Sequence, residues 1–302
     1  MEVWEALLLG LIQGLCEFLP VSSSGHLVLL QRWLGVDGDT MLFNITVHVA
    51  TLLAVFAVMR GDILDLIRQP FSSRSKAVLI SFIPTAALAL LLKTFAPGWV
   101  GGRYLAVGFM LSAALLTFMW AGSRKAAHAG AVKDSDTPDK NNLPQSAAAV
   151  AAKECVKCES KPSQRQSGCD KKSSAGSALH SDSGISFKSA LFAGIAQGIA
   201  VAPGLSRSAS TITALTAAGS QKQSAVRFSF LMSIPVILAS AAMEALTADF
   251  AAVSFLPLAA GFAAAFLSGL LSVRFMLKIF SRSSPLPFVL YLIAMSALSL
   301  AF

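Results

Sequence analysis

Six apolar runs in the chain are each long enough to cross the hydrocarbon core of a bilayer, which takes about 20 residues with a range of roughly 17 to 25. Charged residues make up only 13% of the 302 residues, against roughly 25% in ordinary soluble domains. We therefore predict an all-α integral membrane protein with six transmembrane helices. The runs are Met41 to Met59, Ala77 to Phe95, Tyr104 to Ala121, Phe228 to Leu246, Ala251 to Val273 and Leu286 to Phe302.

Two further apolar stretches, residues 3–34 and 187–218, are broken midway by proline, serine and glycine. The first contains QGLCEFLPVSSSGH from residue 13, and the second contains PGLSRSAST from residue 203. Each stretch is predicted to be a re-entrant hairpin of two half-helices joined at membrane depth. Ionisable side chains are expensive there and mark functional sites. The two hairpin tips are therefore expected to form one site.

The two hairpins resemble one another in sequence. GLIQGL from Gly10 and GIAQGI from Gly194 each lead to a proline and a serine-rich turn. The resemblance indicates an internal repeat, with one hairpin and three spanning helices in each half. An odd number of crossings inverts the second half relative to the first. We predict membrane repeats at residues 1–122 and 187–302, joined by a segment at 123–186.

The basic residues predict the orientation of these repeats. Placing the N-terminus outside puts nine Lys or Arg of the shorter connections on the inner face and three on the outer face, as the positive-inside rule requires. Both termini are then outside, and the central segment is cytoplasmic. The nine are Arg60, Arg68, Arg74, Lys76, Lys222, Arg227, Arg274, Lys278 and Arg282, and the three are Arg32, Lys93 and Arg103.

The central segment, residues 123–186, lacks apolar periodicity and is rich in Ser, Lys, Ala and Gln. It is predicted to be a flexible basic linker. Much of the net charge of +8 arises here and at the inner rim, so anionic lipid headgroups are more natural neighbours than nucleic acid. Cys155, Cys158, Cys169 and His180 match no common structural zinc spacing, and we interpret the cysteines as free thiols.

The first hairpin tip carries residues suited to phosphate chemistry. Gln13 and Glu17 lie one helical turn apart and point at the same spot. Ser22, Ser23 and Ser24 then open the next half-helix, where unpaired N–H groups and the positive end of the dipole favour an anion. One serine would suffice to cap that half-helix, so three indicate a further role.

The second tip supplies Ser206, Arg207, Ser208, Ser210 and Thr211 at the start of its own half-helix. Arginine can grip a phosphate through two parallel hydrogen bonds, so the two tips together describe a phosphate cradle. A purely structural pairing of the buried Glu17 with Arg207 is the alternative.

Two histidines, His26 and His48, lie in the first hydrophobic half. His26, beside Glu17 and the serines, is a candidate catalytic residue. Asn44 and His48 also lie one helical turn apart, but a hydrogen-bonded core pair explains them equally well, and they are left out of the predicted site.

Known sequence motifs narrow the possible classes of site. The sequence contains neither a nucleotide-binding P-loop nor the His-Glu-x2-His motif of zinc proteases. Ser24-Gly25-His26 resembles the Ser-Gly-His of phosphatidate-phosphatase-type lipid phosphatases, but their later histidine is replaced here by Thr213. Gln13-x3-Glu17 followed by FLPVSSSGH, and Pro203-Gly-x-Ser-Arg-Ser-x2-Thr211, closely resemble the two signature motifs of the bacitracin-resistance type undecaprenyl-diphosphate phosphatases. The resemblance covers both hydrophobic halves and leaves out the central segment.

The resemblance implies hydrolysis of undecaprenyl diphosphate, a lipid carrier of peptidoglycan synthesis, by a multi-pass protein of the bacterial inner membrane. It also implies a divalent cation, Mg²⁺ or Ca²⁺, and a site that opens toward the periplasm. Gln13 replaces the commoner glutamate and cannot carry charge, so metal binding is expected to rest on Glu17. The oligomeric state stays open, a homodimer included.

The residues suggest two routes of hydrolysis. In one, Ser23 attacks the terminal phosphorus, His26 or Glu17 accepts its proton, and Arg207 stabilises the phosphoryl oxygens. The cradle for that phosphate is expected to comprise Gln13, Ser22, Ser24, Ser206, Ser208 and Thr211. In the other route, water attacks directly. A lipid flippase using the same cradle is the alternative function, although a binding-only site would not require Glu17, Ser23 and His26.

Overall fold

The computed structural model describes residues 1–36, 40–100, 102–135, 185–246, 254–280 and 283–301, and all regular structure among them is helical. Five of the described helices are long and apolar enough to cross a membrane. They are α3 (Met41–Val58), α5 (Ser73–Phe95), α7 (Leu105–Ser135), α11 (Lys222–Ala245) and α12 (Phe255–Phe275). The sixth predicted span is a shorter apolar helix, α13 (Leu286–Leu298). The all-helical, membrane-spanning prediction is confirmed.

The two interrupted stretches each form two helices. They are α1 (Val3–Phe18) with α2 (Ser23–Leu34), and α9 (Phe187–Ile199) with α10 (Arg207–Ala217). Pro20 in the first connection and Pro203 with Gly204 in the second disfavour a continuous helix, and a serine then caps the second helix. Ser22 accepts from the Gly25 amide and Ser206 from the Ala209 amide.

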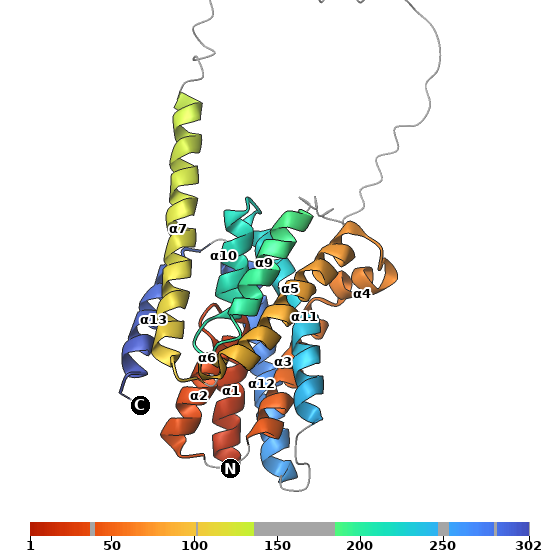
Figure 1. The fold of residues 1–302 in the computed structure, drawn as a ribbon, viewed down its shortest axis with the longest axis vertical. Helices are drawn as coiled ribbons and strands as arrows, with labels where there is room; N and C mark the ends of the chain where they lie inside the picture. The colour runs from red at the N-terminus through yellow and green to blue at the C-terminus, as the bar shows by residue number, and fades with distance from the viewer. Residues whose placement is uncertain (37–39, 101, 136–184, 247–253, 281–282, 302) are drawn as a thin grey trace, which may run out of the picture. The chain divides into compact units, whose positions relative to one another are not determined.

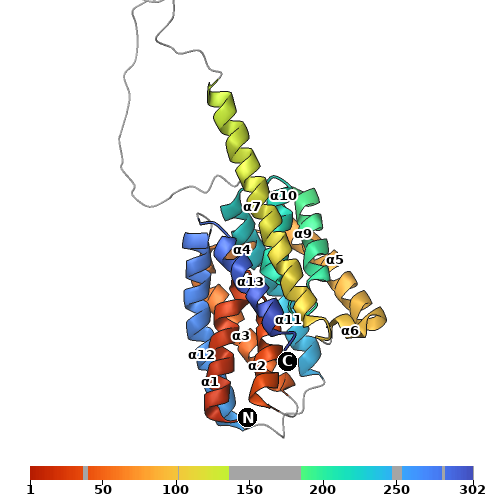
Figure 2. The same cartoon turned by 90° about the vertical axis from the view of Figure 1, so that its left-hand side faces the viewer.

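The helix pairs enter the compact unit, Met1–Gly122 with Asp182–Phe302, from opposite ends. In Figure 1, α1 and α2 occupy the lower part, α9 and α10 lie above them, and the two connections meet between. The view in Figure 2 shows α13 running back toward the end at which α1 begins. Two short helices, α4 (Arg60–Arg68) and α6 (Pro97–Val100), complete the described elements with the π-helical turn Met276–Phe280 that continues α12.

Glycines let the half-helices pack closely on spanning helices. A Cβ at Gly10 would lie 2.3 Å from the Gly261 carbonyl oxygen of α12, and one at Gly194 would lie 2.2 Å from the Ser81 carbonyl oxygen of α5. Gly14 meets α12 and Gly198 meets α5 in the same way. Gly14 and Gly198 therefore serve helix packing.

Hydroxyl groups connect the same helix pairs. Ser272 of α12 donates to the Leu15 carbonyl of α1 at 2.7 Å, and Thr85 of α5 contacts the Gly194 carbonyl of α9 at 2.9 Å. Such bonds between helices hold membrane bundles together where the hydrophobic effect contributes little. Both half-helices that lead into the connections are therefore fixed by backbone contact and by hydrogen bonds.

The helix α7 continues through Ser135, into the segment that the sequence predicts as a linker from residue 123. The reason is local, since the residues between Ala121 and Val132 are mostly alanine, lysine and arginine, which favour helix. Cys155, Cys158, Cys169 and His180 lie outside the described residues.

Candidate active site

The two helix connections touch through a pair of glycines. A Cβ on Gly25 would lie 2.8 Å from the Cα of Gly204, and Gly204 itself has a φ of +90°. Gly204 is thus in a backbone conformation that favours glycine, whereas Gly25 is helical and is needed for the close approach. Ser208 ties the connections further by donating to the Leu19 carbonyl at 2.9 Å.

A serine of α7 supports the second connection from behind. The Ser112 hydroxyl lies 3.1 Å from the Gly204 carbonyl and accepts the Ser206 amide at 2.7 Å. These bonds fix the backbone just before Arg207. The guanidinium group therefore projects from a fixed helix start.

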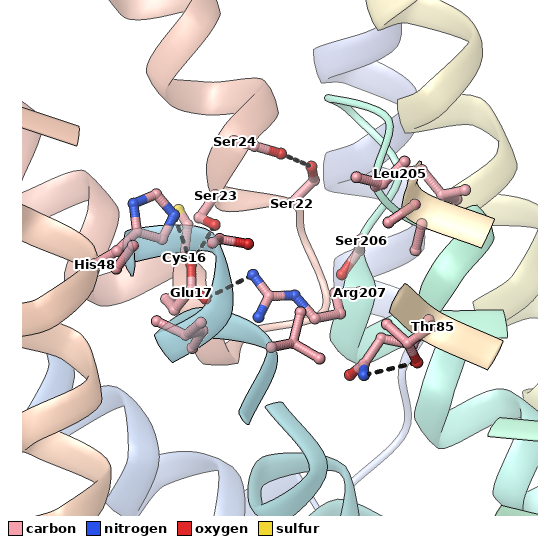
Figure 3. Close-up of a pocket in the computed structure, with 18 of the residues that line it drawn as sticks. Cys16, Glu17, Ser22, Ser23, Ser24, His48, Thr85, Leu205, Ser206 and Arg207 are labelled. Carbon is pink, nitrogen blue, oxygen red and sulfur yellow. Dashed lines mark hydrogen bonds and ion pairs between the residues drawn. The ribbon is translucent and has the colours of Figure 1, made fainter. Parts of the chain in front are cut away.

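Glu17 is the centre of the polar cluster (Figure 3). One carboxylate oxygen, Oε2, accepts from Gln13 Nε2 at 2.9 Å and from Ser23 Oγ at 2.5 Å, and the other, Oε1, accepts from Arg207 Nη2 at 3.1 Å. The Glu17 side chain is 2% exposed and that of Arg207 is 26% exposed. A buried carboxylate needs such partners, because an unpaired charge in a dry interior is strongly unfavourable.

His48 also reaches this carboxylate, which the sequence analysis did not expect. Its Nε2 lies 3.8 Å from Glu17 Oε2, and its Nδ1 bonds to the Asn44 carbonyl at 2.7 Å. The Asn44 side chain turns elsewhere and accepts from Gln31. The polar spacing of Asn44 and His48 in an apolar helix was the available signal, but it is equally compatible with a core pair.

A cavity of about 250 Å³ opens over this cluster. Its polar lining includes residues at both connections, His48 of α3 and Thr85 of α5, as Figure 3 shows. Sequence reasoning missed Thr85 and Glu244, which lie in predicted spanning helices whose patterns indicate only apolar helix. It also missed Gln197, whose signal was its position in the second repeat, equivalent to that of Gln13 in the first. The polar and ionisable lining residues are Cys16, Glu17, Ser22, Ser23, Ser24, His48, Thr85, Gln197, Ser206, Arg207, Ser240 and Glu244.

His26 lies outside this cavity. Its Nδ1 is 2.7 Å from the Ser22 carbonyl oxygen, and its Nε2 is 2.6 Å from the Tyr291 hydroxyl of α13. It lines a separate apolar groove with Ile12 and Trp33. Both ring nitrogens are therefore engaged away from Glu17 and Ser23, and the geometry offers Glu17 as the base beside Ser23.

Some of the other predicted residues line the cavity, and the rest support the residues that do. Ser22, Ser24 and Ser206 line the cavity, and the Ser22 and Ser24 hydroxyls lie 3.5 Å apart. Gln13 is fully buried behind Glu17. Thr211 bonds to Ser229 of α11 at 2.6 Å and holds the start of α10 in place.

The family described as "Bacitracin resistance protein BacA" matches residues 6–152 and 161–298 of this chain. The chain belongs to the bacitracin-resistance family. A relative named undecaprenyl-diphosphatase in Carboxydothermus hydrogenoformans is 32% identical, with 93% of this chain and 90% of the relative covered. One of the same name in Bacteroides fragilis is 33% identical, with coverage of 96% and 94%.

The family match runs further into the central segment than the sequence motifs indicated. It continues to residue 152 and resumes at residue 161, leaving only a short gap. The expectation that residues 123–186 lie outside the family resemblance was wrong. Signature motifs are confined to the hairpin tips, so they carry no information about how far the weaker similarity extends.

Three buried polar atoms of this bacitracin-resistance family site lack a hydrogen-bond partner among the described residues. They are Arg207 Nη1, Gln13 Oε1 and Gln197 Oε1. A buried donor without a partner is costly, and Arg207 Nη1 belongs to a residue that lines the cavity. The Arg207 guanidinium, which lines the cavity, therefore has one donor nitrogen that no described residue satisfies.

A divalent cation such as magnesium requires oxygen ligands, and Glu17 is the carboxylate at the centre of the cluster. No group of three His, Cys, Asp or Glu side chains able to hold a metal occurs in the described parts of the chain. Magnesium commonly takes one or two carboxylates and completes its coordination with phosphate oxygens and water. Glu17 with a diphosphate in the cavity fits that pattern, whereas an all-protein cage does not.

Proposed function

We propose that this protein is a membrane phosphatase that hydrolyses undecaprenyl diphosphate to undecaprenyl phosphate and inorganic phosphate, regenerating the lipid carrier of peptidoglycan synthesis. The observation that carries the proposal is the contact of Ser23 Oγ with Glu17 Oε2 at 2.5 Å, in a cavity also lined by Arg207. Binding alone does not require a hydroxyl beside a buried carboxylate. The names of the relatives agree with hydrolysis and do not favour a flippase.

The chemistry follows from the positions of these three side chains. Ser23 Oγ attacks the terminal phosphorus as Glu17 takes its proton, so an O–P bond forms to serine while the bond to the bridging oxygen breaks. Undecaprenyl phosphate leaves with that oxygen. The proton taken by Glu17 passes to the departing phosphate group or to solvent, which returns Glu17 to its carboxylate form. Water then attacks the phosphoserine and gives a proton to Glu17, and Glu17 returns a proton to Ser23 Oγ as the bond from Oγ to phosphorus breaks, so inorganic phosphate and free Ser23 result.

Arg207 stabilises the charge that develops on the phosphoryl oxygens. Its Nη2 holds Glu17, and its Nη1 has no partner among the described residues. The N-termini of α2 and α10 also meet at the cavity, and their first-turn amides favour an anion. Preorganised donors of this kind are commonly the largest single contribution to catalysis.

A divalent cation, magnesium or calcium, is part of this proposal. Glu17 would hold it together with the phosphate oxygens of the substrate, and the bound ion would neutralise charge on the diphosphate. Gln13 can contribute a neutral oxygen, since its Nε2 donates to Glu17 and its Oε1 is unpartnered. Removal of the metal by a chelator is expected to abolish hydrolysis, and addition of Mg²⁺ or Ca²⁺ to restore it.

The membrane arrangement that we infer is an inverted repeat with two re-entrant hairpins. It is supported by the exchange of partners between the halves, in which α1 packs on α12 and α9 packs on α5 through equivalent glycines. It is also supported by the opposite directions from which α1–α2 and α9–α10 reach the centre (Figure 1). Each hairpin then returns to the side from which it entered.

The site is proposed to open toward the periplasm. The cavity lining on α11 lies in its second half, from Val236 to Glu244, whereas the basic residues Lys222 and Arg227 begin that helix. The positive-inside rule puts the basic end in the cytoplasm. Labelling of Lys93→Cys but not Arg68→Cys by a membrane-impermeant maleimide in intact cells is expected, and the reverse pattern would contradict this orientation.

Purified protein provides the test of function. Phosphate release from undecaprenyl diphosphate with Mg²⁺ is expected, with loss in Glu17→Gln and Arg207→Ala. Trapping a phosphorylated peptide that contains Ser23 would support the serine route over direct attack by water. Absence of phosphate release by the native protein, together with lipid translocation in vesicles, would favour the flippase instead.

A further inference from the structure

The hydrogen bonds of His26 fix its tautomer. The Ser22 carbonyl oxygen can only accept, so His26 Nδ1, at 2.7 Å, must donate to it. In the neutral ring, Nε2 is then an acceptor, and the Tyr291 hydroxyl at 2.6 Å donates to it. A directed chain therefore runs from α13 through the imidazole to the backbone of the first connection.

The backbone at the end of this chain is strained. Ser22 has a φ of 67° and is the sole non-glycine residue with positive φ among the described residues. Residues held in such sparsely populated regions are unfavourable and persist where their surroundings fix them. The His26 ring holds the Ser22 carbonyl, and the Ser22 side chain caps α2.

The strained residue directly precedes Ser23. A rotation of the Ser22 peptide would move Ser23 Oγ away from Glu17 Oε2, which now lies 2.5 Å from it. The rings of His26 and Tyr291 are stacked, with centroids 5.6 Å apart and an interplanar angle of 3°, and Phe109 packs edge-on against the imidazole. The imidazole thus packs against two aromatic rings and is engaged at both nitrogens.

We propose that Tyr291 is a positioning residue, whose hydroxyl orients His26 so that the imidazole holds Ser22 in its strained conformation and Ser23 against Glu17. The proposal rests on the phosphatase function proposed above. Tyr291 touches neither the cavity nor the reacting atoms. It connects the last described helix to the hairpin that carries the nucleophile.

Tyr291→Phe tests this role, because it removes one oxygen and keeps the stacked ring. The kcat for phosphate release is expected to fall about tenfold or more, while KM changes by less than about twofold, since misplacement of a reacting group by about 1 Å can cost about a hundredfold in rate. Tyr104→Phe is the matched control. Its ring faces Trp99 at 6.0 Å, and native kinetics are expected. An unchanged kcat in Tyr291→Phe would overturn the proposal.

The effect of Tyr291→Phe in a Ser22→Gly background distinguishes the positioning of Ser22 from a general structural role of Tyr291. Glycine adopts positive φ without strain, so it needs less support from His26. Ser22→Gly alone is expected to lose activity through the missing cap, yet adding Tyr291→Phe to it should cost less than twofold. An equal loss in both backgrounds would contradict a role in holding Ser22.

A spectroscopic measurement separates this proposal from the proposed function. In histidine-¹⁵N-labelled protein, the signals assigned through His26→Asn should show a protonated Nδ1 and an unprotonated Nε2. Tyr291→Phe should shift the Nε2 signal, and Tyr104→Phe should not. This result does not depend on catalysis. Failure of the native protein to release phosphate would count against the phosphatase, whereas a His26 ring unaffected by Tyr291→Phe would count against the positioning chain.

Discussion

Glu17 and Arg207 form an ion pair at 3.1 Å although 190 residues separate them in the chain. The pair joins the two helix pairs, since Glu17 lies in the last turn of α1 (Val3–Phe18) and Arg207 begins α10. It leaves Arg207 Nη1 without a partner. The same guanidinium can therefore hold the carboxylate in place and bind a phosphoryl group.

Arg207→Ala is expected to lower kcat/KM for phosphate release by about a hundredfold to a thousandfold, the size of effect seen when one preorganised donor to a developing charge is removed. Arg207→Lys should recover only part of the loss, because an ammonium group lacks the fork that can serve both partners. Steady-state kinetics check this. Lys93→Ala, which removes an exposed basic residue, is the control, and an equal loss in it would point to a general charge effect.

Glu17→Gln preserves the shape of the side chain but cannot accept the Ser23 proton. Activity is expected to fall by about 10²–10⁴-fold, the range typical of general-base removal. Ser23→Ala should cause a loss of similar size, and the double variant should be little worse, because residues that act as a unit are not additive. Rapid-quench measurement of phosphate release tests this. Additive losses would show that Glu17 and Ser23 act independently.

The glycine contacts predict stability. Gly194→Ala places a Cβ 2.2 Å from a backbone oxygen of α5, and such overpacking typically costs about 1–3 kcal/mol. A lower midpoint of thermal unfolding in detergent is expected. Gly61→Ala is the control, because nothing lies within 4 Å of its Cβ position, and it should leave the midpoint unchanged. Equal stability of the two variants would argue against tight packing of α9 on α5.

The long apolar helices and the two broken stretches could be predicted from sequence because their signals are local. The length of an apolar run shows directly whether a helix can cross the membrane. Pro20 and Pro203, each closely followed by serine, show where a helix is interrupted. The pairing of α1 with α12 could not be predicted in this way. It depends on a contact between Gly10 and Gly261, which lie far apart in the chain, and the sequence around a glycine in a membrane helix does not identify the helix on which it packs.

The positions of the polar side chains could also be predicted only in part. The position of Glu17 among Gln13, Ser23 and Arg207 agrees with the site predicted from the motifs. His26 was grouped with them by proximity in sequence, but the turn of α2 directs it to Tyr291. His48 was set aside, and the packing of α3 brings it to Glu17. Side-chain direction depends on tertiary packing, which motifs do not encode.

Gln13→Glu replaces the neutral residue beside Glu17 with the carboxylate that is commoner in the first motif. Gln13 Nε2 now donates to Glu17 Oε2 at 2.9 Å, so the substitution exchanges a donor for a second negative charge at the same place. Affinity for oxygen-bound cations increases with the number of charged ligands. The Mg²⁺ concentration that gives half-maximal phosphate release is therefore expected to fall, by about tenfold, and titration of metal into chelator-treated protein measures it.

Gln31→Glu is the control for this prediction. It alters a glutamine that is paired with Asn44 and lies outside the cavity lining, so it should leave that concentration unchanged. If Gln13→Glu left the metal requirement as it is, the cation would have to bind away from Glu17, and the proposed assignment of Glu17 as its carboxylate ligand would be wrong.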